Sequence, residues 1–186
     1  MRLILASNSP RRRDLLELLS DDFAVVPSFA DESATGVPSE RAIDAARAKV
    51  NAVARDVSGV VIGADTIVVI DAQILGKPRT CSDARKMLET LSGRTHRVLT
   101  GVCILNTETR QERTHCEETR VTFRALRDRE IDAYLDTGEY HDKAGAYAIQ
   151  GKAMKFISKI EGDYANVMGL PLYCLISMLR ELGVDL

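Results

Sequence analysis

Three arginines, Arg11, Arg12 and Arg13, stand where a helix is expected to begin. In LASNSPRRRDLL (5–16), Ser9 matches an N-cap, a proline follows it, and the later leucines supply an apolar face. Positive charge is unfavourable there, because a helix N-terminus already carries about half a positive charge. Together with the Ser7 and Ser9 hydroxyls and the first-turn N–H groups, Arg11 and Arg12 therefore predict a cradle for phosphate. The alternative is a solvated basic helix start.

Two segments carry carboxylates that could activate water or hold a metal ion. Asp65 interrupts the apolar stretch GADTIVVI (63–70), where a carboxylate is costly unless it is paired, hydrogen-bonded or bound to metal. Its small neighbours predict space for a ligand, and the alternative is a structural ion pair. Asp31 and Glu32 follow a predicted strand, and for them the alternative is a solvated turn.

Further cations and one polar, glycine-rich stretch complete the set of candidates. Lys49 lies in RAKV, where the alternative is a solvated helix face, and Lys77 lies between two turn-forming residues in GKP. The stretch DKAGAYAIQG (142–151) is too irregular for a helix. Its Tyr147 and Gln150 could stack on a base and read its edge, unless the stretch is an ordinary ordered loop.

This combination of side chains favours one type of chemistry. No Ser-His-Asp or Cys-His arrangement stands out, so acyl transfer has no support. Many cations with a few carboxylates suit hydrolysis of a polyphosphate by metal-activated water. Glu32 and Asp65 would hold the ion or take the proton of the water, and their hard oxygen ligands favour Mg²⁺ or Mn²⁺.

Strands and helices that alternate along the chain position these residues. Strands are expected over 2–6, 23–29, 59–70, 71–75, 97–109, 111–126 and 154–162. Helices are expected over 10–20, 38–57, 81–91 (capped by Ser82 or a neighbour), 128–138 and 170–183. Because hairpins occur alongside interleaved helices, we predict an α/β fold with a mixed sheet. No linker or repeat divides residues 1–186, which predicts a single domain.

Composition excludes several classes of protein. With 45% hydrophobic and 28% charged residues, the 186-residue chain can bury a sizeable core. Its net charge of −2 argues against specific binding of nucleic acid through a broad basic surface. The four cysteines form no CxxC pair, which fits a reducing cytoplasm. No signal peptide or run of 18 apolar residues is present, so no membrane span is expected.

The order of the motifs is more specific than any one of them. In chain order they are LASNSPRR, DE, AK, GADTIV, GKP, LSGRTHRV, DKAGAYAIQG and GDYANVMGLPL, and the match that they define runs from residue 3 to about 173. This succession resembles the Maf family of nucleoside triphosphate pyrophosphatases. The resemblance implies hydrolysis between the α- and β-phosphates to a monophosphate and pyrophosphate. It also implies an elongated, twisted sheet flanked by helices, with two lobes around a deep cleft, as in inosine triphosphatases.

The resemblance also implies roles for individual residues. Asp65 matches the proton acceptor, and Glu32 matches a carboxylate that helps to hold a divalent cation. The positions that match the phosphate end of the cleft are Ser7, Arg11, Arg12, Lys49 and Lys77. A homodimer is also implied.

Three positions bear on the choice of nucleotide. Arg11, Thr66 and Gln150 match the branch that resembles dTTP/UTP pyrophosphatases. The Gln150 amide both donates and accepts, so it can pair with the O4/N3 edge of uracil or thymine. Two alternatives stay open. The chain could be a nucleotide-dependent regulatory protein of cell division and septum formation, or it could apply the same chemistry to modified or non-standard nucleotides.

Overall fold

The computed structural model describes residues 1–29 and 36–186, which fall into two compact units. Unit 1 comprises Met1–Thr66, Thr100–Glu117 and Gly169–Leu186, and unit 2 comprises Ile67–Leu99 and Glu118–Met168. Three long strands contribute residues to both units: β3 (Val60–Ile70), β5 (Thr95–Asn106) and β6 (Glu112–Phe123).

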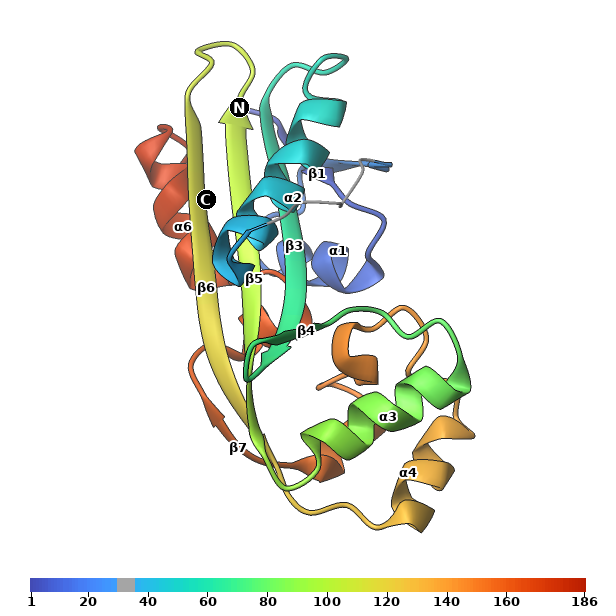
Figure 1. Ribbon diagram of the computed structural model, residues 1–186. Coiled ribbons are helices and arrows are strands. Elements are labelled where there is room, and N and C mark those ends of the chain that lie inside the picture. The colour runs from blue at the N-terminus through green and yellow to red at the C-terminus, as the bar shows by residue number, and fades with distance from the viewer. Residues whose placement is uncertain (30–35) are drawn as a thin grey trace. The chain divides into compact units, whose positions relative to one another are not determined.

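The strands form a mixed sheet in the order β2-β1-β3-β5-β6-β7, with β4 paired to β3 (Figure 1). Strand β1 (Leu3–Ala6) is parallel to β2 (Phe23–Val26) and to β3. The short strand β4 (Gln73–Leu75) runs antiparallel to β3, and β7 (Ile157–Glu161) runs antiparallel to β6. The predicted α/β class with a mixed sheet is therefore confirmed.

Apart from α5 (Tyr164–Met168), the helices agree with the sequence pattern except at their ends. They are α1 (Pro10–Glu17), α2 (Pro38–Val53), α3 (Cys81–Leu91), α4 (Asp128–Leu135), α5 (Tyr164–Met168) and α6 (Leu172–Glu181). The first two end earlier than predicted, and the cap of α3 is Thr80, which forms a capping box with Asp83. In the described part of the chain, no helix has both the length and the apolar character needed to cross a bilayer.

Two stretches differ from the prediction. The sequence predicts no helix over α5, whose five residues are too few to show helical periodicity. The strand predicted over 154–162 begins only at Ile157, because a 3₁₀ turn (η2, Lys152–Phe156) takes up its first residues.

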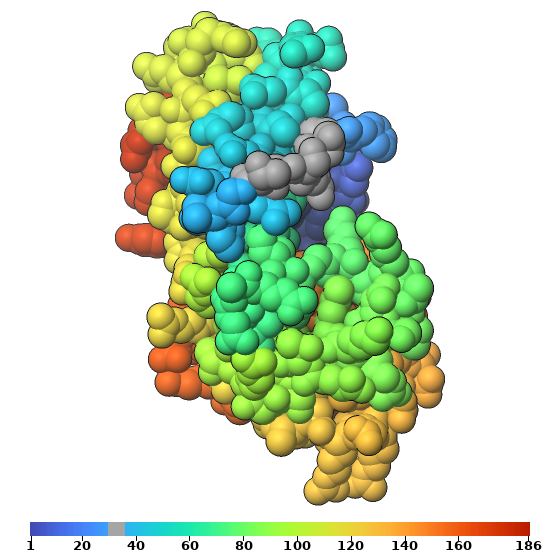
Figure 2. Space-filling view, viewed as in Figure 1, coloured from blue at the N-terminus to red at the C-terminus, as the bar shows by residue number. Residues whose placement is uncertain are grey.

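In unit 1, helix α2 packs directly on the backbone of two strands. A Cβ added to Gly101 on β5 would overlap the backbone of Ala42, and one added to Gly63 on β3 would lie 2.7 Å from the Ala46 carbonyl oxygen. In the space-filling view, the atoms of α2 lie in front of the part of β3 that belongs to unit 1 (Figure 2). Gly63, two residues before Asp65, therefore accommodates the helix, and the prediction that the small neighbours of Asp65 leave space for a ligand is wrong at Gly63.

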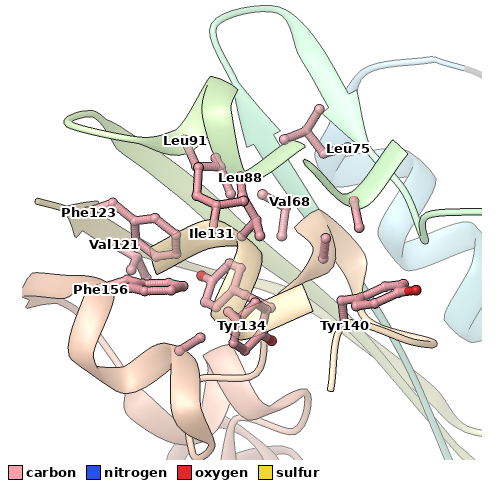
Figure 3. Packing of buried hydrophobic residues seen from close by; sticks show 14 of the residues in the cluster. Val68, Leu75, Leu88, Leu91, Val121, Phe123, Ile131, Tyr134, Tyr140 and Phe156 are labelled. Carbon is pink, nitrogen blue, oxygen red and sulfur yellow. The ribbon is translucent and has the colours of Figure 1, made fainter. Parts of the chain in front are cut away.

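The core of unit 2 is rich in aromatic rings. Phe156 lies between Phe123 and Tyr134 (Figure 3), with ring centroids 6.1 Å and 5.4 Å away. His96, which is 1% exposed, joins this core edge-on to Phe123, and its Nε2 lies 2.8 Å from the Tyr147 hydroxyl.

We expect His96 to make stability depend on pH. Burial lowers the pKa of His96 to about 4, whereas the unfolded chain has the ordinary value near 6.5. Between these values the unfolded chain binds a proton that the folded chain does not, so stability falls as the pH falls. Urea titrations at pH 7 and pH 4.5 should show a loss about 2–3 kcal/mol larger for wild type than for His96→Gln. Equal losses in the two proteins would contradict this assignment.

Candidate active site

A buried ion pair joins helix α2 to strand β3. The Lys49 ammonium donates to Asp65 Oδ1 at 2.7 Å and lies 3.4 Å from the carbonyl oxygen of Ala64. The two side chains are 9% and 14% exposed. An unpaired charge at this depth would be strongly destabilising, so the pair explains how an apolar strand tolerates a carboxylate. The structure thus brings together two residues that the sequence pattern singled out separately.

A second set of contacts in unit 1 holds Arg12. Its Nε donates to the Gly169 carbonyl at 2.7 Å, and its Nη2 donates to Thr66 Oγ1 at 3.0 Å. Thr66 Oγ1 in turn lies 3.0 Å from Thr100 Oγ1. Because Thr66 follows Asp65 on β3, these contacts place the guanidinium of α1 beside the strand that carries the carboxylate.

The loop before α1 differs in detail from the prediction. Ser9 stands at the N-cap, but its side chain makes no capping hydrogen bond to the residues that the structure describes. Instead, the Ser9 N–H donates to Oγ of the buried Ser7 at 3.1 Å. The first turn of α1 contains Arg11 and Arg12 and no acidic residue. The helix N-terminus therefore keeps the positive character that an anion would compensate.

The neighbouring arginine has an ordinary environment. Arg13 is 54% exposed and forms ion pairs with Asp14 at 3.6 Å and with Glu17 at 3.5 Å. Exposed pairs of this kind contribute little to stability. Arg11, by contrast, is half-buried in the same helical turn.

Two predicted site residues belong to unit 2. Lys77 follows β4 and is exposed, and Gln150 is exposed at the end of the glycine-rich stretch. The prediction for Tyr147 is wrong, because its ring is 6% exposed and packs against His96 and Phe123. It has no open face on which a base could stack.

The carboxylates available to a metal ion are few. Asp31 and Glu32 lie outside the described residues. Elsewhere, in residues 1–29 and 36–186, no group of three or more His, Cys, Asp or Glu side chains is placed to hold a metal. Among the residues that the structure describes, Asp65 is the one carboxylate that the sequence analysis proposes as a metal ligand, and it is paired with Lys49.

Two residues of this network were not singled out from the sequence. Gly169 has φ +117°, and a Cβ there would lie 3.3 Å from Thr66 Oγ1 and 3.4 Å from Arg12 Nε. The sequence feature that could have identified Gly169 is its place in the motif GDYANVMGLPL. Thr100 is fully buried on β5. Its signal was a polar side chain inside an apolar strand, the same signal that marked Asp65.

Comparison with known proteins gives one matching family, and relatives by sequence that share one name. The sequence matches the family described as Maf-like protein over residues 2–182. The dTTP/UTP pyrophosphatase of Thermococcus gammatolerans is 51% identical over 183 residues, which cover 98% of this chain and 97% of that protein. The dTTP/UTP pyrophosphatase of Bacillus cereus is 46% identical over 187 residues, which cover 99% and 97%. Among solved structures, the Ham1 protein of Staphylococcus aureus is 14% identical with a TM-score of 0.48, covering 66% of this chain and 72% of that one.

Proposed function

The chain belongs to the family of Maf-like proteins, and from this premise we propose that it is a nucleoside triphosphate pyrophosphatase. Its substrates are dTTP and UTP, the nucleotides for which its relatives are named. Water attacks the α-phosphorus, the bond to the bridging oxygen breaks, and pyrophosphate leaves the nucleoside monophosphate. The observation that carries the proposal is the Lys49–Asp65 pair at 2.7 Å, on the strand whose next residue, Thr66, accepts a hydrogen bond from Arg12 at 3.0 Å.

Asp65 is the group that takes the proton from the attacking water. A general base must lie within hydrogen-bond reach of the proton that it takes, and the Lys49 ammonium fixes the position of the carboxylate by donating to Oδ1 at 2.7 Å. The 14% of the Asp65 side chain that remains exposed gives water access. Lys49 therefore acts on the carboxylate as an orienting partner.

The start of α1 binds the triphosphate. Arg11 and Arg12 supply guanidinium groups, while Ser7 and Ser9 shape the loop that leads into the helix. The positive end of the helix dipole and the two arginine charges repel each other when no anion is bound. The negative charge of a phosphate group would reduce this repulsion. Lys77 adds a further cation in this proposal.

A divalent cation, Mg²⁺ or Mn²⁺, is part of the proposal. Asp65 would provide one protein ligand, and Glu32 is proposed as a second. When bound, such an ion neutralises phosphate charge and increases the acidity of a coordinated water. The residues of the chain would orient the carboxylate and the phosphates around it.

The choice of pyrimidine is assigned to Gln150, Thr66 and Arg11. The exposed Gln150 amide can donate to O4 and accept from N3–H of uracil or thymine. The buried ring of Tyr147 takes no part in this recognition.

A panel of nucleotides tests the proposal. Purified protein is incubated with dTTP, UTP, dCTP, GTP, ITP and 7-methyl-GTP, each with Mg²⁺, with Mn²⁺ or with a chelator. We expect pyrophosphate release to be fastest with dTTP and UTP, and to fall at least about tenfold when the metal is removed. Release of orthophosphate would contradict cleavage between the α- and β-phosphates. A strong preference for 7-methyl-GTP or ITP would contradict the pyrimidine assignment.

The proposal includes a cytoplasmic homodimer as the working form, which the family resemblance supports. Light scattering on the purified protein tests this part, because it separates the mass of one 20.5 kDa chain from that of two.

A further inference from the structure

We propose that Thr100 is a positioning residue for the nucleotide site, an inference that rests on the proposed function. Its side chain is fully buried on β5 and lies 3.0 Å, oxygen to oxygen, from the hydroxyl of Thr66. It acts on the substrate through Thr66 and Arg12.

The hydroxyl of Thr66 is held from two sides. Arg12 can only donate, so Thr66 Oγ1 is the acceptor of the Arg12 contact at 3.0 Å. The contact to Thr100 then determines where the remaining lone pair and the hydroxyl proton of Thr66 point. Without the Thr100 hydroxyl, Thr66 keeps its contact to Arg12 but loses this second constraint on its direction.

The same arrangement orients the guanidinium of Arg12. Contacts from two different nitrogens, Nε to Gly169 and Nη2 to Thr66, fix the plane of the group. One of these contacts is made by a backbone carbonyl, and the other by a hydroxyl that depends on Thr100. Thr100 therefore supports the more adjustable of these two contacts.

Kinetics of Thr100→Val test the proposal, because valine has nearly the same shape and lacks the hydroxyl. A group that binds substrate and transition state equally affects KM and leaves kcat unchanged. We expect KM for dTTP to rise about tenfold in Thr100→Val, as for loss of a buried hydrogen-bond partner, with kcat within about twofold of wild type. Thr100→Ser should restore the wild-type KM.

A double variant separates positioning from a general loss of structure. Since Thr100 acts through Thr66, adding Thr100→Val to Thr66→Val should raise KM no further. The matched control is Thr122→Val, which removes one hydroxyl from the Thr95–Thr122 pair in unit 2, where the oxygens are 2.9 Å apart. Its KM should equal that of wild type.

Several results would overturn the role of Thr100. These are an unchanged KM in Thr100→Val, a failure of Thr100→Ser to restore it, or an independent second rise in the double variant. If Thr100→Val does not fold, Thr100→Ala is measured in the same way, and an unchanged KM there has the same meaning. An inactive wild type would overturn the proposed function itself, whereas an active wild type with these results overturns only the role of Thr100.

Discussion

Replacement of Asp65 by Asn is expected to lower kcat for pyrophosphate release from dTTP by about 10²–10⁴-fold, the usual contribution of a positioned general base. Asparagine has the shape of aspartate, and its amide oxygen can still accept from Lys49, but it cannot take the proton of the attacking water. The rate is measured at saturating dTTP with Mg²⁺, and dTTP binding is checked separately to show that the site is intact.

A matched variant distinguishes this effect from a change of charge alone. Asp71 lies just after the same strand, has a 74% exposed side chain, and pairs with Arg94 at 2.7 Å. Asp71→Asn should keep the wild-type rate. If Asp65→Asn also hydrolyses dTTP at the wild-type rate, Asp65 is not the proton acceptor. If the wild type binds dTTP without turnover, the nucleotide-dependent regulatory role becomes the better description.

The second large effect concerns stability. Lys49→Met should lower the free energy of unfolding by about 3–5 kcal/mol, because it leaves the Asp65 carboxylate in a poorly solvated position without its ammonium. For a chain of this size the melting temperature should fall by about 10 °C. Calorimetry at pH 7 measures both quantities.

The double variant Lys49→Met/Asp65→Leu should recover most of that stability, because an apolar pair of similar volume needs no compensating charge. As a control, Arg13→Met removes two ion pairs whose members are all more than half exposed, and should change stability by less than about 0.5 kcal/mol. A Lys49→Met protein as stable as wild type would mean that the buried pair contributes nothing to folding.

Much of the fold follows from local patterns. Continuous apolar runs predicted β1, β3 and β5, and helical spacing with a proline at the first position predicted α1 and α2. The points where α1 and α2 end could not be predicted to the residue. A helix end depends on where its buried face leaves the rest of the fold, which local sequence does not encode.

The sequence allowed candidate residues to be selected, but it did not predict the contacts between them. A carboxylate inside a strand needs a partner, which is why Asp65 is a candidate. Nothing in the local sequence identifies Lys49, 16 positions away, as that partner. Tyr147 was assigned wrongly for the same reason. Its surroundings in the loop are small and polar, whereas the aromatic core that buries it comes from β5 and β6.

The contact of α2 with Gly63 and Gly101 has a consequence for how this protein can vary. The helix reaches Asp65 only because two strand residues lack a side chain, and a methyl group at either would push α2 outward and take Lys49 with it. The distance between Lys49 and the sheet therefore depends on Gly63 and Gly101, which have no proposed role in the chemistry. The two glycines therefore help to set the geometry of the proposed site, and we expect that a substitution at either can inactivate the protein although neither is a proposed reacting group.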